Sequence, residues 1–133
     1  MYSLMPSMIT GIAQLDAEHQ DLVSAINRIH EAEQSGSTPE VLNRLGEFRD
    51  HLAGHFKHEE TYLTLHRYPG RDAHMKHHAE TLVSLDRIVE ELSSSLIELG
   101  GIAAECFTDL LGAILTMDMR FLNWQAELRR RAD

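Results

Sequence analysis

Several features that would identify other classes of protein are scarce in this sequence of 133 residues. Cys106 is its only cysteine, so no intrachain disulfide can form and we expect a reducing, cytoplasmic compartment. No apolar run approaches the roughly 20 residues that a membrane-spanning helix needs. The first residues, MYSLMPSMITG, lack the charged and apolar regions of a secretory signal. We therefore expect no membrane association of this segment.

Basic residues are also scarce, because 12 Lys and Arg stand against 21 Asp and Glu, for a formal net charge of −9. Nucleic-acid binding needs a basic stripe or patch, so we predict no nucleic-acid partner. The basic run from Arg129 to Arg131 lies at the end of the last predicted helix, where it complements the helix dipole. The apolar fraction of 43% and the length fit one folded domain over residues 1–133.

Apolar residues recur at helical spacing in four long segments, and no segment alternates with the period of a strand. The predicted helices cover about 15–34, 37–65, 72–100 and 101–130. Short connections between long helices imply antiparallel neighbours. The sequence therefore predicts an all-α fold, an antiparallel up-down-up-down four-helix bundle.

Local signals place the helix ends. Either Ser37 or Thr38 is expected to cap the second helix, because both precede Pro39 and Ser37 has capping-box spacing to Glu40. Asp72 is expected to cap the third helix, and the glycine pair at 100–101 to end it.

Histidines and carboxylates lie on the predicted inward faces of all four helices. The candidates are His19, His55, Glu59, His74, His78 and Asp118. Two pairs, His55–Glu59 and His74–His78, are four residues apart, which places both members on one helix face, one turn apart. Burying several ionisable groups in one core is costly unless they pair with each other or bind metal. A metal site satisfies all six together, although any single histidine of this kind is more often an ordinary core residue.

The type and number of these ligands favour iron. A structural zinc site takes four ligands and usually includes cysteine. Four imidazoles and two carboxylates from four helices are instead typical of two metals bridged by carboxylates inside a bundle.

At these motifs the sequence resembles the haemerythrin family, the bacterial haemerythrins with their HHE-type cation-binding domain. The matching stretches are TGIAQLDAEHQDL around His19, HFKHEE from His55, and YPGRDAHMKHH up to His78. The resemblance implies two non-haem iron ions in an oxo- or hydroxo-bridged site that binds dioxygen reversibly. It also implies that Glu59 and Asp118 bridge the irons.

The resemblance further implies how the irons divide the histidines: His19 and His55 hold one iron, and His74 and His78 hold the other. The sequence departs from the family pattern at Ala113, five residues before Asp118, where the family has histidine. Water, an exogenous anion or another side chain could fill that position. An extra open position would favour autoxidation, peroxide chemistry or weaker metal retention.

Neighbouring residues have less certain roles. His51 lies four residues before His55 and is a candidate for a side chain that supports the cluster or a bound ligand without coordinating metal. His58 and His77 are expected to point away from the cluster, and Glu60 to be solvated. Aromatic residues that either pack the core or wall off an oxygen pocket are Phe56, Tyr62, Phe121 and Trp124.

Three functions follow. The leading hypothesis is a di-iron protein that binds dioxygen or a related small molecule such as nitric oxide, for carriage, storage or sensing. A sensor would act on a fused or separate signalling domain. The alternatives are a di-iron oxidoreductase acting on oxygen or peroxide, and an iron-storing or degenerate metal-binding bundle. The sequence favours a binding protein over an enzyme.

Overall fold

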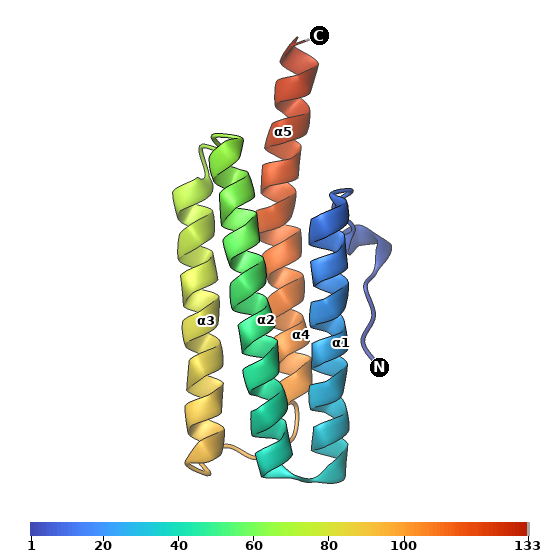
Figure 1. Ribbon diagram of the computed structural model, residues 1–133, viewed down its shortest axis with the longest axis vertical. Helices are drawn as coiled ribbons and strands as arrows, with labels where there is room; N and C mark the ends of the chain where they lie inside the picture. The colour runs from blue at the N-terminus through green and yellow to red at the C-terminus, as the bar shows by residue number, and fades with distance from the viewer. Residues whose placement is uncertain (133) are drawn as a thin grey trace.

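The computed structural model describes residues 1–132, so Asp133, the last residue of the predicted domain, lies outside the described part. Its elements are, in chain order, η1 (Pro6–Met8), α1 (Ala13–Ser35), α2 (Thr38–Leu65), α3 (Arg71–Ser93), α4 (Ile102–Gly112), η2 (Ala113–Asp118) and α5 (Met119–Ala132). The last three elements follow without a break and form the fourth helix of a bundle in which successive helices run in opposite directions (Figure 1). No strand occurs within residues 1–132. The predicted all-α four-helix bundle is confirmed.

The turn between α1 and α2 follows the sequence signals closely. Gly36, with φ of 75°, adopts the left-handed conformation that ends α1. Ser37 is the N-cap of α2, and its hydroxyl accepts the Glu40 N–H at 3.3 Å. Ser37 therefore caps this helix, rather than Thr38.

The expectation that Asp72 caps α3 is wrong. Helix α3 begins at Arg71, with Gly70 as the N-cap residue, and the Gly70 carbonyl accepts the His74 N–H at 3.0 Å. Asp72 instead lies in the first turn, where an exposed carboxylate is favourable beside the helix dipole. His74 is consequently held by the first hydrogen bond of the helix.

The expected end of α3 at Gly100 is also wrong, because the helix ends at Ser93. Ser95 takes the left-handed conformation with φ of 58°. The Leu96 N–H then donates to the Glu91 carbonyl at 2.8 Å, and the Ser95 N–H donates back into the last turn. This is the Schellman arrangement that usually has glycine at the left-handed position. Serine there gave no stop signal in the sequence.

Helix α4 is capped by a residue from another helix. The Glu33 carboxylate of α1 accepts the N–H of Gly101 at 3.1 Å and the N–H of Ala103 at 2.5 Å. Free N–H groups at a helix N-terminus favour a carboxylate. The start of the last helix is therefore tied to the end of the first.

We expect Glu33→Ala to lower the free energy of unfolding by about 1–2 kcal/mol, the usual cost of losing an N-cap. Urea unfolding of the metal-free protein measures this. Glu33→Gln keeps an acceptor oxygen and should cost less, while Glu31→Ala, at an exposed site on the same helix, should cost almost nothing. A loss for Glu31→Ala as large as for Glu33→Ala would contradict the capping role.

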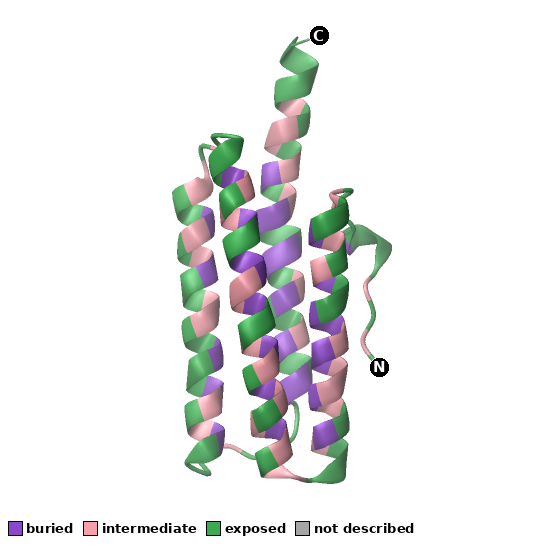
Figure 2. Ribbon diagram, in the orientation of Figure 1, coloured by how far each residue is buried: buried purple, intermediate pink, exposed green. Residues whose placement is uncertain are grey.

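The apolar core fills the part of the bundle where α1 ends and α2 begins. Figure 2 shows buried residues on the faces that the helices turn towards one another. Its most deeply buried apolar side chains include Leu22, Ile26, Ile29, Val41, Leu45 and Ile114. Each contributes roughly 1.5–3 kcal/mol by burial, so this core can hold the bundle while polar groups occupy the other end. None of the helices within residues 1–132 has both the length and the apolar character needed to cross a membrane.

Candidate metal centre

Six buried polar or charged residues occur in the described part of the chain, and they are the six candidates predicted from the sequence. They are His19, His55, Glu59, His74, His78 and Asp118. None exposes more than 6% of its surface. Burial of ionisable groups is costly unless they pair with each other or coordinate a metal, so the collection of all six at one place indicates a common site.

Glu59 lies at the centre of this cluster. Its Oε2 is 3.1 Å from His55 Nε2, one turn earlier on α2. Its Oε1 contacts two imidazoles of α3, His74 Nε2 and, at 3.2 Å, His78 Nε2. The spacing of four residues places His55 one turn from Glu59 on α2 and His74 one turn from His78 on α3. All three histidines therefore reach the Glu59 carboxylate.

Asp118 lies opposite Glu59 and completes the cluster. Its Oδ1 is 3.1 Å from His74 Nε2, and its Oδ2 is 3.4 Å from His19 Nε2. His19 Nε2 is in turn 3.1 Å from His55 Nε2. Each carboxylate thus lies between a histidine from the α1–α2 side and a histidine of α3.

The last helix is widened where it enters the cluster. The stretch Ala113–Asp118 is π-helical, whereas the sequence pattern predicted one regular α-helix. In a π-helix, hydrogen bonds join residues five apart, so 113 and 118 lie on the same face. In an α-helix they would lie about 140° apart. The π-helical turn therefore places residue 113 on the face that carries Asp118 into the cluster.

The ligand atoms form two groups that overlap. His19, His55, Glu59 and Asp118 have one ligand atom each, all within 4.8 Å of one another. A second group meets the same limit, with His74 and His78 in place of the first two histidines. The two groups share both carboxylates, which is the arrangement expected of two neighbouring cations bridged by carboxylates.

Several atoms of the cluster lack a hydrogen bond. Among the buried atoms without one are Glu59 Oε2 and His74 Nε2, although each has an oppositely charged atom nearby. A buried polar atom without a partner costs roughly 1–3 kcal/mol. Imidazole nitrogens and carboxylate oxygens that converge without satisfying one another are suited to a metal ion between them.

The electrostatics of the cluster agree with this description. Burial raises the pKa of Glu59, but contacts with three surrounding histidines outweigh it and hold the pKa well below the ordinary value. Burial lowers the pKa of His74, yet contacts with Asp118 and Glu59 raise it to about 9. Burial, with Glu59 nearby, raises the pKa of Asp118. The metal-free cluster therefore holds protons at neutral pH in positions that cations would take.

Two glutamates that the sequence analysis did not assign to the site orient its histidines. Glu18 Oε1 is 2.9 Å from His55 Nδ1, and Glu60 Oε2 is 2.8 Å from His78 Nδ1. Glu60 was expected to be solvated and is instead a partner of the cluster. A carboxylate on one imidazole nitrogen leaves the other nitrogen free to bind metal. Both glutamates are sequence neighbours of candidate ligands, which is the one signal that could have identified them.

We expect Glu18→Ala to weaken metal binding by about 10–100-fold, because removing the partner of a ligating histidine has this effect in other metal sites. Competition with a chelator measures the affinity. Glu31→Ala removes the same charge from an exposed position of α1 and is the matched control. Similar affinities for the two variants would show that Glu18 does not orient His55.

The other histidines lie outside the cluster. His58 is exposed, and its Nδ1 shares the Glu18 carboxylate with His55. His51 is exposed and lies in the wall of a surface pocket that also contains Glu18 and His58. His77 is partly buried and lies on a groove between α3 and α4. A supporting role for His51 stays a prediction.

A small cavity lies directly beside the cluster. Its volume is about 10 Å³, close to what one water-sized molecule occupies, and Glu59, His74 and Asp118 contribute to its lining. Apolar and aromatic side chains close it, among them Leu63 and Phe121. Of the aromatic candidates, Phe121 and Tyr62 border this cavity, whereas Phe56 stacks on His78 with 3.8 Å between ring centroids. Trp124 packs against Phe121 and Tyr68.

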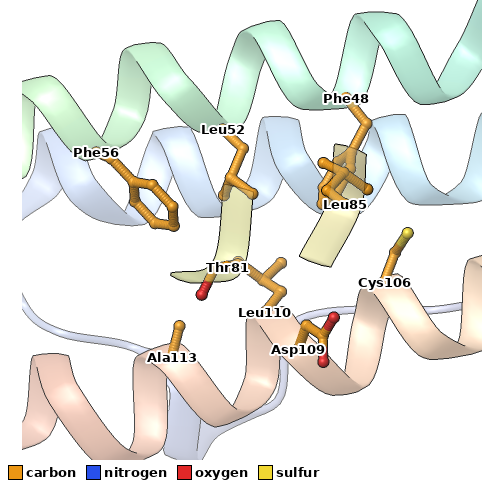
Figure 3. Close-up of a pocket in the computed structure, with 9 residues that line it drawn as sticks. All are labelled: Phe48, Leu52, Phe56, Thr81, Leu85, Cys106, Asp109, Leu110 and Ala113. Carbon is orange, nitrogen blue, oxygen red and sulfur yellow. The ribbon is translucent and has the colours of Figure 1, made fainter. Parts of the chain in front are cut away.

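A second, apolar cavity lies further along the bundle between α2, α3 and the last helix. Figure 3 shows the side chains of α2 facing those of the last helix across it. Ala113 and Cys106 both line it. Burial raises the pKa of the Cys106 thiol to about 12, so this cysteine is an unreactive core residue.

Comparison with known proteins identifies the family. The hemerythrin HHE cation binding domain matches residues 10–122. Bacteriohemerythrins of Pseudomonas aeruginosa strains LESB58 and UCBPP-PA14 are 33% identical over 69 residues, which is 52% of this chain and 45% of the relative. The bacteriohemerythrin of Pseudomonas paraeruginosa strain PA7 matches to the same extent. The matched stretch thus spans about half the length of these relatives. The chain belongs to the haemerythrin family.

Proposed function

We propose that this protein holds two non-haem iron ions in the buried cluster and binds dioxygen or a related diatomic molecule such as nitric oxide, for carriage, storage or sensing. The observation that carries the proposal is the pair of ligand groups that share Glu59 and Asp118. In this proposal, His19 and His55 hold one iron, and His74 and His78 hold the other. As a sensor, the protein would act on a fused or separate signalling domain.

The donor atoms support iron. Each group offers two imidazole nitrogens and two shared carboxylates, with no thiolate. Structural zinc sites are closed by four ligands and usually include cysteine, whereas calcium and magnesium prefer oxygen ligands alone. Mixed nitrogen and oxygen ligands with bridging carboxylates in a helix bundle suit di-iron or di-manganese centres.

The surroundings support a diatomic ligand. A pair of reduced irons, when bound, can supply the electrons for reversible binding of dioxygen. This chain contributes a cavity of about 10 Å³ beside Glu59 and His74, which admits only a very small molecule. Leu63 and Phe121 close the cavity and keep bulk water from the cluster.

Metal loading should release protons, and the affinity for Fe²⁺ should increase with pH between 6 and 8. A histidine binds metal only as the neutral imidazole. In the metal-free protein the pKa of His74 is raised to about 9, so this imidazole carries a proton at neutral pH that the metal must displace. Displacing this one proton weakens binding by up to about tenfold for each unit of lower pH. The same proton stabilises the metal-free fold fully below about pH 6.5, and this contribution is lost as the pH rises through about 9.

Anaerobic competition with a chelator of known protonation behaviour measures the affinity at each pH. A buffer-indicator titration counts the protons released. An affinity that does not change over this range would mean that the imidazoles are already neutral before loading.

The first test of the proposed function is iron per chain by elemental analysis, with visible spectra recorded reduced and anaerobic, then after air. Two irons and a charge-transfer band that forms in air and reverses when oxygen is removed would support the proposal. One iron or none would refute the two-iron site and favour a degenerate or iron-storing bundle. Two irons that oxidise irreversibly would refute reversible oxygen binding.

A second candidate is a di-iron oxidoreductase acting on oxygen or peroxide. Ala113 favours it, because a methyl group stands on the helix face that carries Asp118 and offers no ligand atom there. Steady consumption of peroxide with a reductant would distinguish this function from binding, since a binding protein forms a stable adduct without turnover.

A further inference from the structure

The small cavity beside the cluster has a side that faces the surface of the protein. Three of its lining residues belong to the cluster itself, namely Glu59, His74 and Asp118. A molecule in the cavity therefore lies against groups proposed to hold metal. The lining residues that are partly exposed are Thr10, Tyr62 and Leu122, whereas the remaining ones are buried. These three residues mark the place where the cavity lies closest to solvent.

Thr10 differs from the other two because it is not part of a helix. Tyr62 belongs to α2 and Leu122 to α5, while Thr10 lies in segment 9–12, which connects η1 to α1. The segment is anchored on one side by Met8, whose side chain is fully buried, and on the other by the start of α1. Opening a short non-helical segment between two anchors costs less than moving a packed helix. Of the three residues, Thr10 is therefore the one that can move away from the cavity.

One carboxylate holds this segment in place. Asp16 Oδ1 accepts the N–H and the hydroxyl of Thr10 at 2.8 Å and 2.7 Å, and Asp16 Oδ2 accepts the Gly11 N–H at 3.0 Å. Gly11 has a φ of 84°, which glycine adopts at little cost, and two successive N–H groups converge on the same side chain. Hydrogen bonds to an ionised carboxylate are stronger than those between neutral groups. Asp16 therefore ties Thr10 to the edge of the cavity.

Helix α1 does not use Asp16 as its cap. The N-cap residue is Ile12, whose side chain makes no hydrogen bond, and Asp16 lies in the first turn of the helix. Its carboxylate is directed back to the segment that precedes the helix. Loss of this carboxylate should therefore release segment 9–12 while α1 stays formed.

We propose that segment 9–12 covers the entrance through which dioxygen or nitric oxide reaches the cluster, and that Asp16 sets the rate of entry and exit by holding Thr10 at this entrance. The inference rests on the proposed function and deepens it. Asp16 does not line the cavity, so it acts on the path of the ligand and not on the bound state. A change in the path alters entry and exit by the same factor and leaves the equilibrium affinity unchanged.

The test is stopped-flow mixing of the reduced, iron-loaded protein with nitric oxide in the absence of air, followed by release into a scavenger. In Asp16→Ala, the association and dissociation rates should both rise at least about tenfold, the factor that corresponds to loss of one charged hydrogen bond. The Kd and the absorption spectrum of the adduct should not change. Asp16→Asn keeps an acceptor oxygen and should have a smaller effect. Asp21→Ala removes an exposed carboxylate from the same helix and should have none.

Leu122→Ala tests the entrance without touching the hydrogen bonds of Asp16. A smaller side chain at this partly exposed edge of the cavity should also raise both rates. Hydrogen exchange of the Thr10 and Gly11 amides in the metal-free protein separates the two effects and does not depend on iron. Exchange should be faster in Asp16→Ala and native in Leu122→Ala. If Asp16→Ala retains less iron than the native chain, Asp16→Asn and Leu122→Ala carry the test.

Faster amide exchange in Asp16→Ala together with native rates for nitric oxide would overturn the inference, because the ligand would then enter elsewhere. A changed Kd or spectrum would also overturn it, since Asp16 would then act on the cluster. Equal acceleration in Asp16→Ala and Asp21→Ala would show a general effect of charge and contradict the role of Asp16. A native chain that holds no iron, or holds iron and takes up no nitric oxide, would refute the proposed function and the inference together.

Discussion

Glu59→Ala should remove most of the metal from this protein. The Glu59 carboxylate belongs to both groups of ligand atoms, and it contacts imidazoles from α2 and from α3. Losing a shared ligand weakens both metal positions at once. The loss of affinity should therefore exceed the roughly 10–100-fold that removal of an orienting carboxylate costs. Iron per chain by elemental analysis, after loading and desalting, measures the effect.

The matched control for this change is His51→Ala, on the same helix but exposed and outside both groups. Its iron content should fall much less than that of Glu59→Ala, because His51 is expected at most to support the cluster without coordinating metal. Circular dichroism should show that both variants remain helical, because much of the apolar core, such as Ile29 and Leu45, lies towards the other end of the bundle. Equal iron contents in the two variants would contradict the central position of Glu59.

Ala113→His should raise iron occupancy and move the visible spectrum in air towards that expected of the proposed dioxygen-binding di-iron site. The π-helical turn places residue 113 on the face of Asp118, so an imidazole there could reach the half of the cluster that contains His74 and His78. An added nitrogen ligand should tighten that metal position by at least about tenfold, because even a side chain that only orients a ligand changes metal affinity by roughly 10–100-fold. Chelator competition and the absorption spectrum report the two effects separately.

Ala113→Leu is the control for this second prediction, since it fills the adjoining cavity with an apolar side chain and adds no ligand. It should change stability by filling or crowding the cavity and should not raise iron occupancy. If Ala113→His behaves like Ala113→Leu, residue 113 does not reach the metal position, and the register around the π-helical turn must differ from that described.

Four of the six candidate residues could be predicted because their signals are local, whereas His19 and Asp118 have no partner four residues away and depended on the family resemblance. Histidine or glutamate at a spacing of four within an apolar stripe places two ligands on one face of any α-helix. The structure accordingly brings His55 and Glu59 together with His74 and His78 around one carboxylate. Their role as metal ligands stays a proposal, which the iron measurement addresses.

The orienting carboxylates could not be predicted in the same way. Glu18 and Glu60 reach histidines on neighbouring helices, so their roles depend on how the helices are rotated and packed. Glu60 even lies off the inward stripe of its own helix, which made solvent the simpler expectation. A contact between helices leaves no periodic signal in either segment.

By itself, the sequence determined the helical class, the start and end of α2, and which six polar residues are buried, because periodicity, capping residues and turn residues act within a few positions of the chain. The tertiary structure alone decided the end of α3 at Ser93, the capping of α4 by Glu33, and the π-helical turn from Ala113 to Asp118. The Glu33 cap joins segments almost 70 residues apart in the chain, while the end of α3 and the π-helical turn use backbone conformations that no residue type in the sequence signals. A serine in the left-handed conformation and a helix widened by one residue are both locally costly, so local sequence preferences predict neither.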